Sequence, residues 1–285
     1  MRNPPARIAL TCHWAQSAIG PTRAPPLSPL ASTLREAILR HLDFRVAVAF
    51  SGGLDPTTLA TVASQQVETL PITVCMAGSL DVQAAKEAAD ALSLPLHLVR
   101  LDEAKLLSDY SMCWNILPGT LTEMELMAGT FAVCEAAQAL GTQSILFGSG
   151  AEELFIGYHK YFEAHSSGDD LDALLSREIE TLPSRDLART QKVAGHFGLE
   201  AKFPFMDTEL VKAVRQVPLS VRLGRLEDRK PLLRALVKEL GVPECARLRP
   251  KKAMQYSSRI HSSMLRLAKA GKIKPLPPKK PFEYD

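Results

Sequence analysis

A short turn sequence, Ser-Gly-Gly-Leu-Asp at residues 51–55, directly follows the apolar run at residues 46–50. The run is too short for a helix and ends on two glycines, which favours a buried strand that enters a tight turn. A helix that starts at Asp55 leaves unpaired backbone N–H groups at its N-terminus, and such groups bind anions. The plain alternative is a strand-to-helix turn in which Asp55 caps the helix and Pro56 takes the first helical position. Taken alone, the stretch leaves both interpretations open, and it is not a Walker loop because no Gly-Lys-Ser/Thr follows.

A second stretch rich in glycine and acid follows another apolar run, at residues 144–147. Residues 147–158 read Phe-Gly-Ser-Gly-Ala-Glu-Glu-Leu-Phe-Ile-Gly-Tyr. One interpretation is a capping box, with Ser149 as the N-cap and Glu152 three residues later. A cap does not account for the Glu-Leu-Phe-Ile-Gly-Tyr sequence that comes after it, so this stretch is a candidate functional motif.

Basic residues gather in two later stretches, Arg-Lys-Pro-Leu-Leu-Arg at residues 229–234 and Arg-Pro-Lys-Lys-Ala-Met-Gln-Tyr at residues 249–256. Clustered lysines usually form a solvated face, so Lys230 and Lys251 are candidates only in combination with the other motifs. Between the second acidic stretch and these lysines, Lys-Phe-Pro-Phe-Met-Asp at residues 202–207 is typical of a capped helix start. We therefore interpret Asp207 as a structural residue first.

The elements that must position these residues alternate between strand and helix in the first half of the chain. The expected strands and helices there are a helix at 33–42 capped by Ser32, a strand at 46–50, a helix at 57–67, a strand at 72–76, a helix from Asp81 to 92, a strand at 96–101, a helix at 122–140 and a strand at 144–147. This alternation predicts an α/β fold with a doubly wound, mostly parallel sheet covered on both faces. The glycine turns would then lie at the carboxyl edge of the sheet, where such sheets bind ligands.

The second half of the chain is predicted to be helical. Its expected helices are separated by glycine and proline breaks and lie at residues 169–182, 185–197, 207–217, 230–240 and 258–270. The predicted organisation is a proline-rich arm at residues 1–30, one domain at 31–270 and a basic, proline-rich tail at 271–285. Within the domain we separate a nucleotide core at 43–160 from a helical part at 161–270.

Composition narrows the class of protein. The chain has 285 residues, of which 46% are hydrophobic and 23% charged, as in a soluble globular protein. A net charge of +3 is too balanced to indicate a nucleic-acid partner. No run approaches the roughly 18 apolar residues that predict a membrane span, and the N-terminus has no apolar core of signal-peptide type. Five widely spaced cysteines without a Cys-x-x-Cys pair indicate a reducing compartment, so we expect a cytoplasmic protein without a disulfide framework or zinc site.

Taken together, the motifs resemble the asparagine synthetase family, specifically its synthase domain, which belongs to the ATP-pyrophosphatase (PP-loop) superfamily. Residues 51–55 look like the pyrophosphate loop, and residues 72–89 resemble the second β–α unit. Residues 147–158 resemble the family sequence Ser-Gly-Glu-Gly-Ala-Asp-Glu-Leu-Phe-Gly-Gly-Tyr. The resemblance covers roughly residues 31–265, and residues 249–256 are most similar to a subgroup that contains the synthase domain without a glutaminase domain.

The resemblance implies a site for ATP and magnesium within an adenine nucleotide alpha hydrolase-like fold. It implies that magnesium is held by Asp55 and Glu152, and that Lys251, Lys230 and Asp55 are catalytic. Lys251 falls on the family lysine that neutralises charge developing on the phosphates. The implied ATP-binding residues are Ala49, Ser51, Gly52, Gly53, Asp55, Thr57, Val74, Phe147 and Gly148.

The implied activity is that of an ATP-dependent, AMP-forming amide ligase of asparagine biosynthesis. Such an enzyme activates a carboxylate, here aspartate first, as an acyl-adenylate that ammonia converts to an amide. The family's glutaminase half uses a Cys at position 2, whereas this sequence begins Met-Arg, so we expect free ammonia or a separate glutaminase partner. The family's substrate-binding residues find no match in residues 120–129, which leaves the carboxylate open.

Two of the chain's departures from the family motifs remove a polar group that the family uses. Pro56 replaces a serine whose N–H and hydroxyl serve the pyrophosphate, and proline offers neither donor. Ser149 replaces an acid that assists adenylate formation and its capture by ammonia. We hypothesise that Thr57 or Thr58 supplies the donor that Pro56 lacks. Two alternatives stay open: a degenerate member that binds nucleotide without turnover, and another PP-loop enzyme such as a tRNA-modifying one, which the low net charge and scattered cysteines disfavour.

Overall fold

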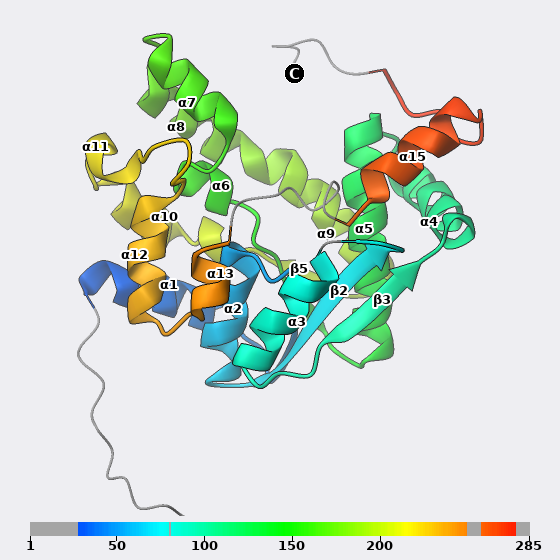
Figure 1. The fold of residues 1–285 in the computed structure, drawn as a ribbon, viewed down its shortest axis with the longest axis horizontal. Coiled ribbons are helices and arrows are strands. Elements are labelled where there is room, and N and C mark those ends of the chain that lie inside the picture. Colours follow the sequence, from blue (N-terminus) through cyan, green and yellow to red (C-terminus); the bar gives the residue numbers. More distant parts are fainter. Residues whose placement is uncertain (1–27, 80, 250–257, 278–285) are drawn as a thin grey trace, which may run out of the picture.

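Five parallel strands form one sheet at the centre of the protein (Figure 1). The computed structural model describes residues 28–79, 81–249 and 258–277. The strands are β1 (Arg45–Ala49), β2 (Glu68–Met76), β3 (His97–Leu101), β4 (Ser144–Leu146) and β5 (Glu200–Lys202). Their order in the sheet is β3-β2-β1-β4-β5, and every neighbouring pair is parallel. The predicted parallel sheet is confirmed; β5, which is three residues long with charged residues at both ends, was not predicted.

The connections cover both faces of the sheet with helices. The α-helices are α1 (Pro29–Leu39), α2 (Leu54–Ser64), α3 (Asp81–Ala91), α4 (Glu103–Ile116), α5 (Leu121–Ala139), α6 (Ala151–Leu154), α7 (His159–Ser166), α8 (Leu171–Thr181), α9 (Asp186–His196), α10 (Thr208–Arg215), α11 (Leu219–Arg222), α12 (Pro231–Glu239), α13 (Glu244–Arg247) and α15 (Ile260–Lys269). Two 3-10 turns are η1 (Leu182–Ser184) and η2 (Pro204–Met206). No helix within the described residues is long and apolar enough to cross a membrane.

Alternate side chains of β1 enter different cores. Val46 and Val48 pack with α1, α2, α3 and α12 on one face, whereas Ala47 packs with α4, α5, α9 and α15 on the other. This alternation follows from the two-residue period of a strand. A smaller cluster joins α7 and α8 away from the sheet, at the upper left of Figure 1. The prediction of a doubly wound sheet is therefore confirmed.

Strand order creates a crevice between β1 and β4. The chain moves outward from β1 to β2 and β3, and then crosses back to place β4 on the other side of β1. In open parallel sheets, ligands bind outside the carboxyl ends of the strands at such a reversal point. Both glycine-containing turns, after β1 and after β4, open into this crevice.

Several helix boundaries differ from the sequence-based predictions. Helix α1 begins at Pro29 and not near residue 33, because Ser28 and not Ser32 is the N-cap, accepting a hydrogen bond from the Ala31 N–H. Proline suits the first position because the N–H it lacks would be unpaired there. Helix α4 was not predicted, although Leu106, Tyr110 and Cys113 recur on one buried face and Asp102 caps its start.

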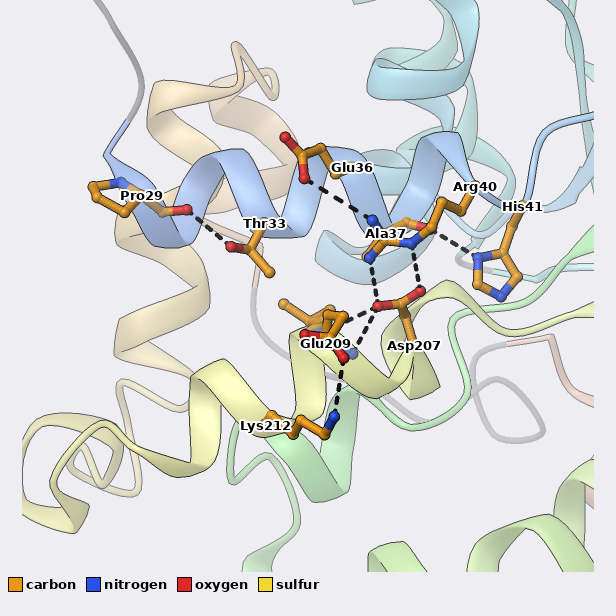
Figure 2. A network of polar contacts seen from close by, with 10 residues as sticks. Pro29, Thr33, Glu36, Ala37, Arg40, His41, Asp207, Glu209 and Lys212 are labelled. Carbon is orange, nitrogen blue, oxygen red and sulfur yellow. Dashed lines mark hydrogen bonds and ion pairs between the residues drawn. The ribbon is translucent and has the colours of Figure 1, made fainter.

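Asp207 joins α1 to α10 (Figure 2). Its carboxylate receives two hydrogen bonds from the Arg40 guanidinium, at 2.9 and 2.6 Å, and accepts the Glu209 and Leu210 backbone N–H groups at 3.1 and 3.2 Å. The prediction that Asp207 caps a helix is confirmed. The hydrogen bonds from Arg40, which lies 167 residues earlier, hold the pKa of Asp207 below its ordinary value of 3.8.

We expect Asp207→Ala to lower the free energy of unfolding by about 1–3 kcal/mol at neutral pH, because a helix cap and a bidentate ion pair are lost. Since the folded-state pKa of Asp207 is lowered, its contribution is present above the unfolded-state pKa. The contribution disappears as the pH falls through the still lower folded-state pKa. Urea unfolding of both proteins across this pH range measures the difference.

Glu209→Ala is the matched control. Glu209 lies two residues away, and its carboxylate, with 65% of the side chain exposed, contacts Lys212 on the surface. Exposed pairs of this kind contribute about 0–1 kcal/mol. Equal urea midpoints for Asp207→Ala and wild type at neutral pH would contradict the role assigned to Asp207.

Candidate functional site

A cavity of about 320 Å³ lies in the crevice at the carboxyl ends of β1, β2 and β4. Its walls come from these strand ends, from the turns that follow β1 and β4, and from α5 and α9. This volume is in the range of small-molecule sites. The residues discussed below line three parts of it: an apolar slot, a glycine turn with a carboxylate cluster, and a further group of charged side chains.

The apolar slot lies at the ends of three adjacent strands. Ala49, Val74 and Phe147 line it at the ends of β1, β2 and β4, respectively. The Thr73 hydroxyl donates a hydrogen bond of 2.6 Å to the Phe50 carbonyl, which fixes the chain as it leaves β1. A slot of this composition suits a flat aromatic group such as a purine base.

The turn after β1 brings backbone N–H groups to the cavity. Gly52 has a φ of +66°, and a Cβ there would lie 2.3 Å from the Ala84 carbonyl oxygen of α3, so only glycine fits. Gly53 is the N-cap of α2 and provides no side-chain cap, which leaves the first helical N–H groups without the usual side-chain acceptor. The Arg249 guanidinium donates to the Ser51 carbonyl and adds positive charge beside the turn.

Three charged side chains from distant parts of the chain meet beneath this turn. Lys230 Nζ lies 2.8 Å from both carboxylate oxygens of Asp55 and 2.7 Å from Oε1 of Glu152. Asp55 lies in the first turn of α2, Glu152 lies in α6, and Lys230 is the N-cap of α12. All three are nearly excluded from solvent, with 10%, 9% and 5% of their side chains exposed.

Lys230 supplies the positive charge that holds the two carboxylates of the cluster together. Burial lowers the pKa of Lys230, but the attraction of Asp55 and Glu152 is stronger and raises it above the ordinary value of 10.5, so the amine stays charged. Close packing holds the group together. A Cβ at Gly157 would lie 1.9 Å from Glu152 Oε2, so a side chain at this position would displace the Glu152 carboxylate.

The two carboxylates fit magnesium only together with other ligands. Mg²⁺ prefers hard oxygen donors and is usually bound by one or two carboxylates and substrate phosphates. Asp55 and Glu152 supply two carboxylates, and among the described residues no group of three or more His, Cys, Asp or Glu is arranged to hold a metal. A magnesium ion bound by these two carboxylates would take its other ligands from water or from substrate phosphates.

The cavity is also lined by Glu153, Asp186 and Arg189, which the sequence analysis did not identify as site residues. Arg189 Nη2 bonds Glu123 at 2.6 Å, and Arg189 Nη1 bonds Asp186 at 2.7 Å. Glu153, in α6, is 5% exposed, and burial raises its pKa to about 7, with the charges of Glu152 and Glu178 raising it further and Lys230 lowering it. The sequence signal for Glu153 was its place in the motif beside Glu152, whereas Asp186 and Arg189 carried none.

The structure brings most of the predicted site residues to this cavity. Those that line it are Ala49, Ser51, Asp55, Val74, Phe147, Gly148 and Glu152. Gly52, Gly53 and Thr57 belong to the same turn and helix without lining the cavity, and Lys230 lies behind the two carboxylates. Lys251 lies outside the described residues.

Pro56 and Ser149, where the chain lacks a polar group of the family sequence, both line the cavity. Ser149 does not cap α6, because Gly150 is the N-cap with a φ of +92°, so the capping-box interpretation is wrong. Thr57 and Thr58 are both fully buried, and the Thr58 hydroxyl already donates to the Leu54 carbonyl. The Thr57 hydroxyl has no hydrogen-bond partner among the described residues. A hydrogen bond from this hydroxyl to a phosphate stays a prediction.

We expect Lys230→Met to lower the free energy of unfolding by about 3–5 kcal/mol, because two buried carboxylates lose their counter-ion. If Asp55 and Glu152 can hold a divalent cation, MgCl₂ should raise the Tm of Lys230→Met more than it raises the Tm of wild type. Thermal unfolding with and without MgCl₂ measures both effects.

Lys238→Met, on the exposed side of the same helix α12, is the control and should unfold like wild type. The same Tm for Lys230→Met and wild type without magnesium would show that the cluster does not depend on this lysine. An equal response of both proteins to MgCl₂ would argue against a metal between the carboxylates.

Comparison with known proteins supports an assignment to a family. The family model described as asparagine synthase matches residues 29–174 and 163–271, which is most of the chain. Among curated relatives, an asparagine synthetase (glutamine-hydrolyzing) of Sandersonia aurantiaca is 26% identical over 225 residues, covering 71% of this chain and 42% of the relative. Asparagine synthetase (glutamine-hydrolyzing) 3 of Arabidopsis thaliana is 27% identical over 225 residues, covering 71% and 38%.

The chain thus spans about two fifths of the length of the curated relatives that it matches. Among solved structures, NMN synthetase from Francisella tularensis aligns over 88% of this chain and 96% of its own, with 14% identity and a TM-score of 0.42. The family match includes both glycine-containing turns, the carboxylates Asp55 and Glu152, and Lys230. On the extent of that match, the chain belongs to the asparagine synthase family.

Proposed function

We propose that this protein is an ATP-dependent, AMP-forming amide ligase that activates a carboxylate as an acyl-adenylate and transfers it to ammonia. The proposal rests on one observation: the turn after β1 and the two carboxylates of the family motifs line the same cavity. Ser51, Asp55 and Glu152 line it together, although they come from different β–α units. Aspartate is the first carboxylate to test, since the family is that of asparagine synthase.

ATP would bind with its base in the apolar slot and its phosphates at the turn after β1. Ala49, Val74 and Phe147 supply the apolar walls, and the N-terminus of α2 supplies N–H groups for the β- and γ-phosphates. Arg249, bonded to the Ser51 carbonyl, keeps the turn in place and adds a cation beside the phosphates. Asp55 and Glu152 would hold Mg²⁺, which supplies positive charge to the phosphate oxygens when bound.

In the first half-reaction a carboxylate oxygen attacks the α-phosphorus, and the bond to the outgoing pyrophosphate breaks. Lys251 and Lys230 are the proposed lysines that offset negative charge on the leaving group. Support for Lys251 is its place in the family motif, two residues after Arg249. Lys230 would act through its charge, held 2.7–2.8 Å from the two carboxylates. In the second half-reaction ammonia attacks the acyl carbon, and the C–O bond to AMP breaks.

A second candidate is a nucleotide-binding protein without turnover. Two observations favour it: Lys230 already occupies the space between the two proposed metal ligands, and Ser149 at the cavity wall lacks the family's carboxylate. In this alternative Lys230 would take the place of the metal permanently. ATP would bind at the turn without being cleaved.

Pyrophosphate–ATP exchange separates these candidates. We expect exchange that needs ATP, Mg²⁺ and one member of a carboxylate panel that includes aspartate. Asp55→Ala should reduce its rate by about 100-fold or more, because a charged group at the phosphates is removed. Added ammonium should convert exchange into net AMP and amide production, measured by mass spectrometry.

Asp90→Ala, which changes an exposed acid on α3, should leave the exchange rate at the wild-type value. ATP binding by calorimetry accompanies each assay. Intact ATP binding with no exchange for any carboxylate would favour the non-catalytic alternative and overturn the ligase proposal.

A further inference from the structure

A second cavity, of about 240 Å³, lies among α8, α10 and α11, at the upper left of Figure 1. It shares no lining residue with the cavity at the strand ends. Leu175 and Ile179 of α8 give it some buried apolar surface. Two arginines, Arg215 and Arg222, also line it, and they lie on elements that the proposed function does not use.

Arg222 brings a buried positive charge to this second cavity. It is the last residue of α11 and is 4% exposed. Its Nε donates a hydrogen bond of 3.0 Å to the Val217 carbonyl, and its Nη2 donates one of 2.5 Å to Asp172 Oδ1. The Asp172 side chain is 59% exposed. Because water screens an exposed carboxylate, Asp172 offsets the cost of the buried guanidinium less than a buried partner would.

Arg215 adds a second guanidinium that has no acidic partner among the described residues. It is the last residue of α10, and its Nη2 donates a hydrogen bond of 2.6 Å to the neutral Ser176 hydroxyl of α8. The charged residues in the described lining are thus two arginines and one aspartate, a surplus of one positive charge. A cavity with this surplus attracts an anion.

The two guanidinium groups have donors left for a ligand. A guanidinium carries five N–H groups in a planar fork that matches the oxygen atoms of phosphate and carboxylate groups. Hydrogen bonds within the described structure use Nε and Nη2 of Arg222 and Nη2 of Arg215, whereas Nη1 of each bonds no other described residue. The Ser176 hydroxyl and the Gln216 amide add neutral polar groups to the same lining.

We propose that this second cavity binds a small-molecule oxyanion, with Arg215 and Arg222 as its counter-ions. Two sources have this chemistry: a phosphate monoester and a carboxylic acid. A cationic ligand is disfavoured, because Asp172, the acid in the described lining, is already bound to Arg222. The inference is independent of the proposed function, since it uses none of the residues of the candidate site.

Arg215→Gln tests the proposal, because it removes an exposed charge from the cavity and leaves the buried Arg222 in place. Calorimetric titrations of the full chain with inorganic phosphate and with acetate, at constant ionic strength, measure binding. We expect wild type to bind at least one of the two anions. The variant should raise the Kd of that anion about tenfold or more, as expected for the loss of a charge-assisted hydrogen bond. Tighter binding of phosphate would assign a phosphate ester, and tighter binding of acetate a carboxylic acid.

Arg177→Gln is the matched control. Arg177 lies on α8 next to Ser176, is exposed and does not line the cavity, so this change removes the same charge and should leave the Kd at the wild-type value. Phosphate bound at the turn after β1 would respond to neither change, so a difference between the two variants belongs to the second cavity.

Two results would overturn the proposal: a wild type that binds neither anion, or equal Kd values in Arg215→Gln and Arg177→Gln. Arg222→Lys gives a second measurement, since it keeps the charge beside Asp172 and replaces the planar fork with a single ammonium. It should also weaken anion binding. A protein without pyrophosphate exchange that still shows the Arg215→Gln effect would lose the ligase activity and keep this oxyanion site.

Discussion

The attraction between Lys230 and the carboxylates of Asp55 and Glu152 is the interaction on which the candidate site depends. It joins α2, α6 and the start of α12, and the two carboxylates would repel each other without the amine between them. Removing Lys230 would leave two buried carboxylates without a counter-ion. The cluster therefore ties the turn after β1 to the turn after β4, and it sets the distance between the parts of the cavity that would hold phosphate and substrate.

Sheet topology explains why these groups can meet at all. Parallel strands send all their carboxyl ends to one edge, and the reversal of strand order between β1 and β4 opens a crevice there. Asp207 does not line the cavity, and its bonds to Arg40 hold α1 against α10. The contacts that stabilise the fold thus include some that do not belong to the site.

The local sequence was enough to predict the strands and helix caps that depend on residues close together in the chain. Residues 46–50 and 72–76 were predicted as strands because short apolar runs end on breakers, and the cap of α10 was predicted from Asp207. Predictions were wrong where two local solutions competed. Ser28 and Ser32 could both cap α1, and Ser28 did so because proline fits the next position. Glycine in the left-handed region at residue 150 displaced the expected serine cap.

By itself the sequence determined the alternation of strands and helices, the two glycine turns and the family to which they belong, because these depend on residues close together in the chain. Only the tertiary structure decided that Lys230 lies between Asp55 and Glu152, 175 and 78 residues away in sequence. It alone decided that Asp186 and Arg189 reach the same cavity, where Arg189 is shared between Asp186 and Glu123. The physical reason is that charge pairing acts across space, and no spacing along the chain encodes which buried acids will find a partner.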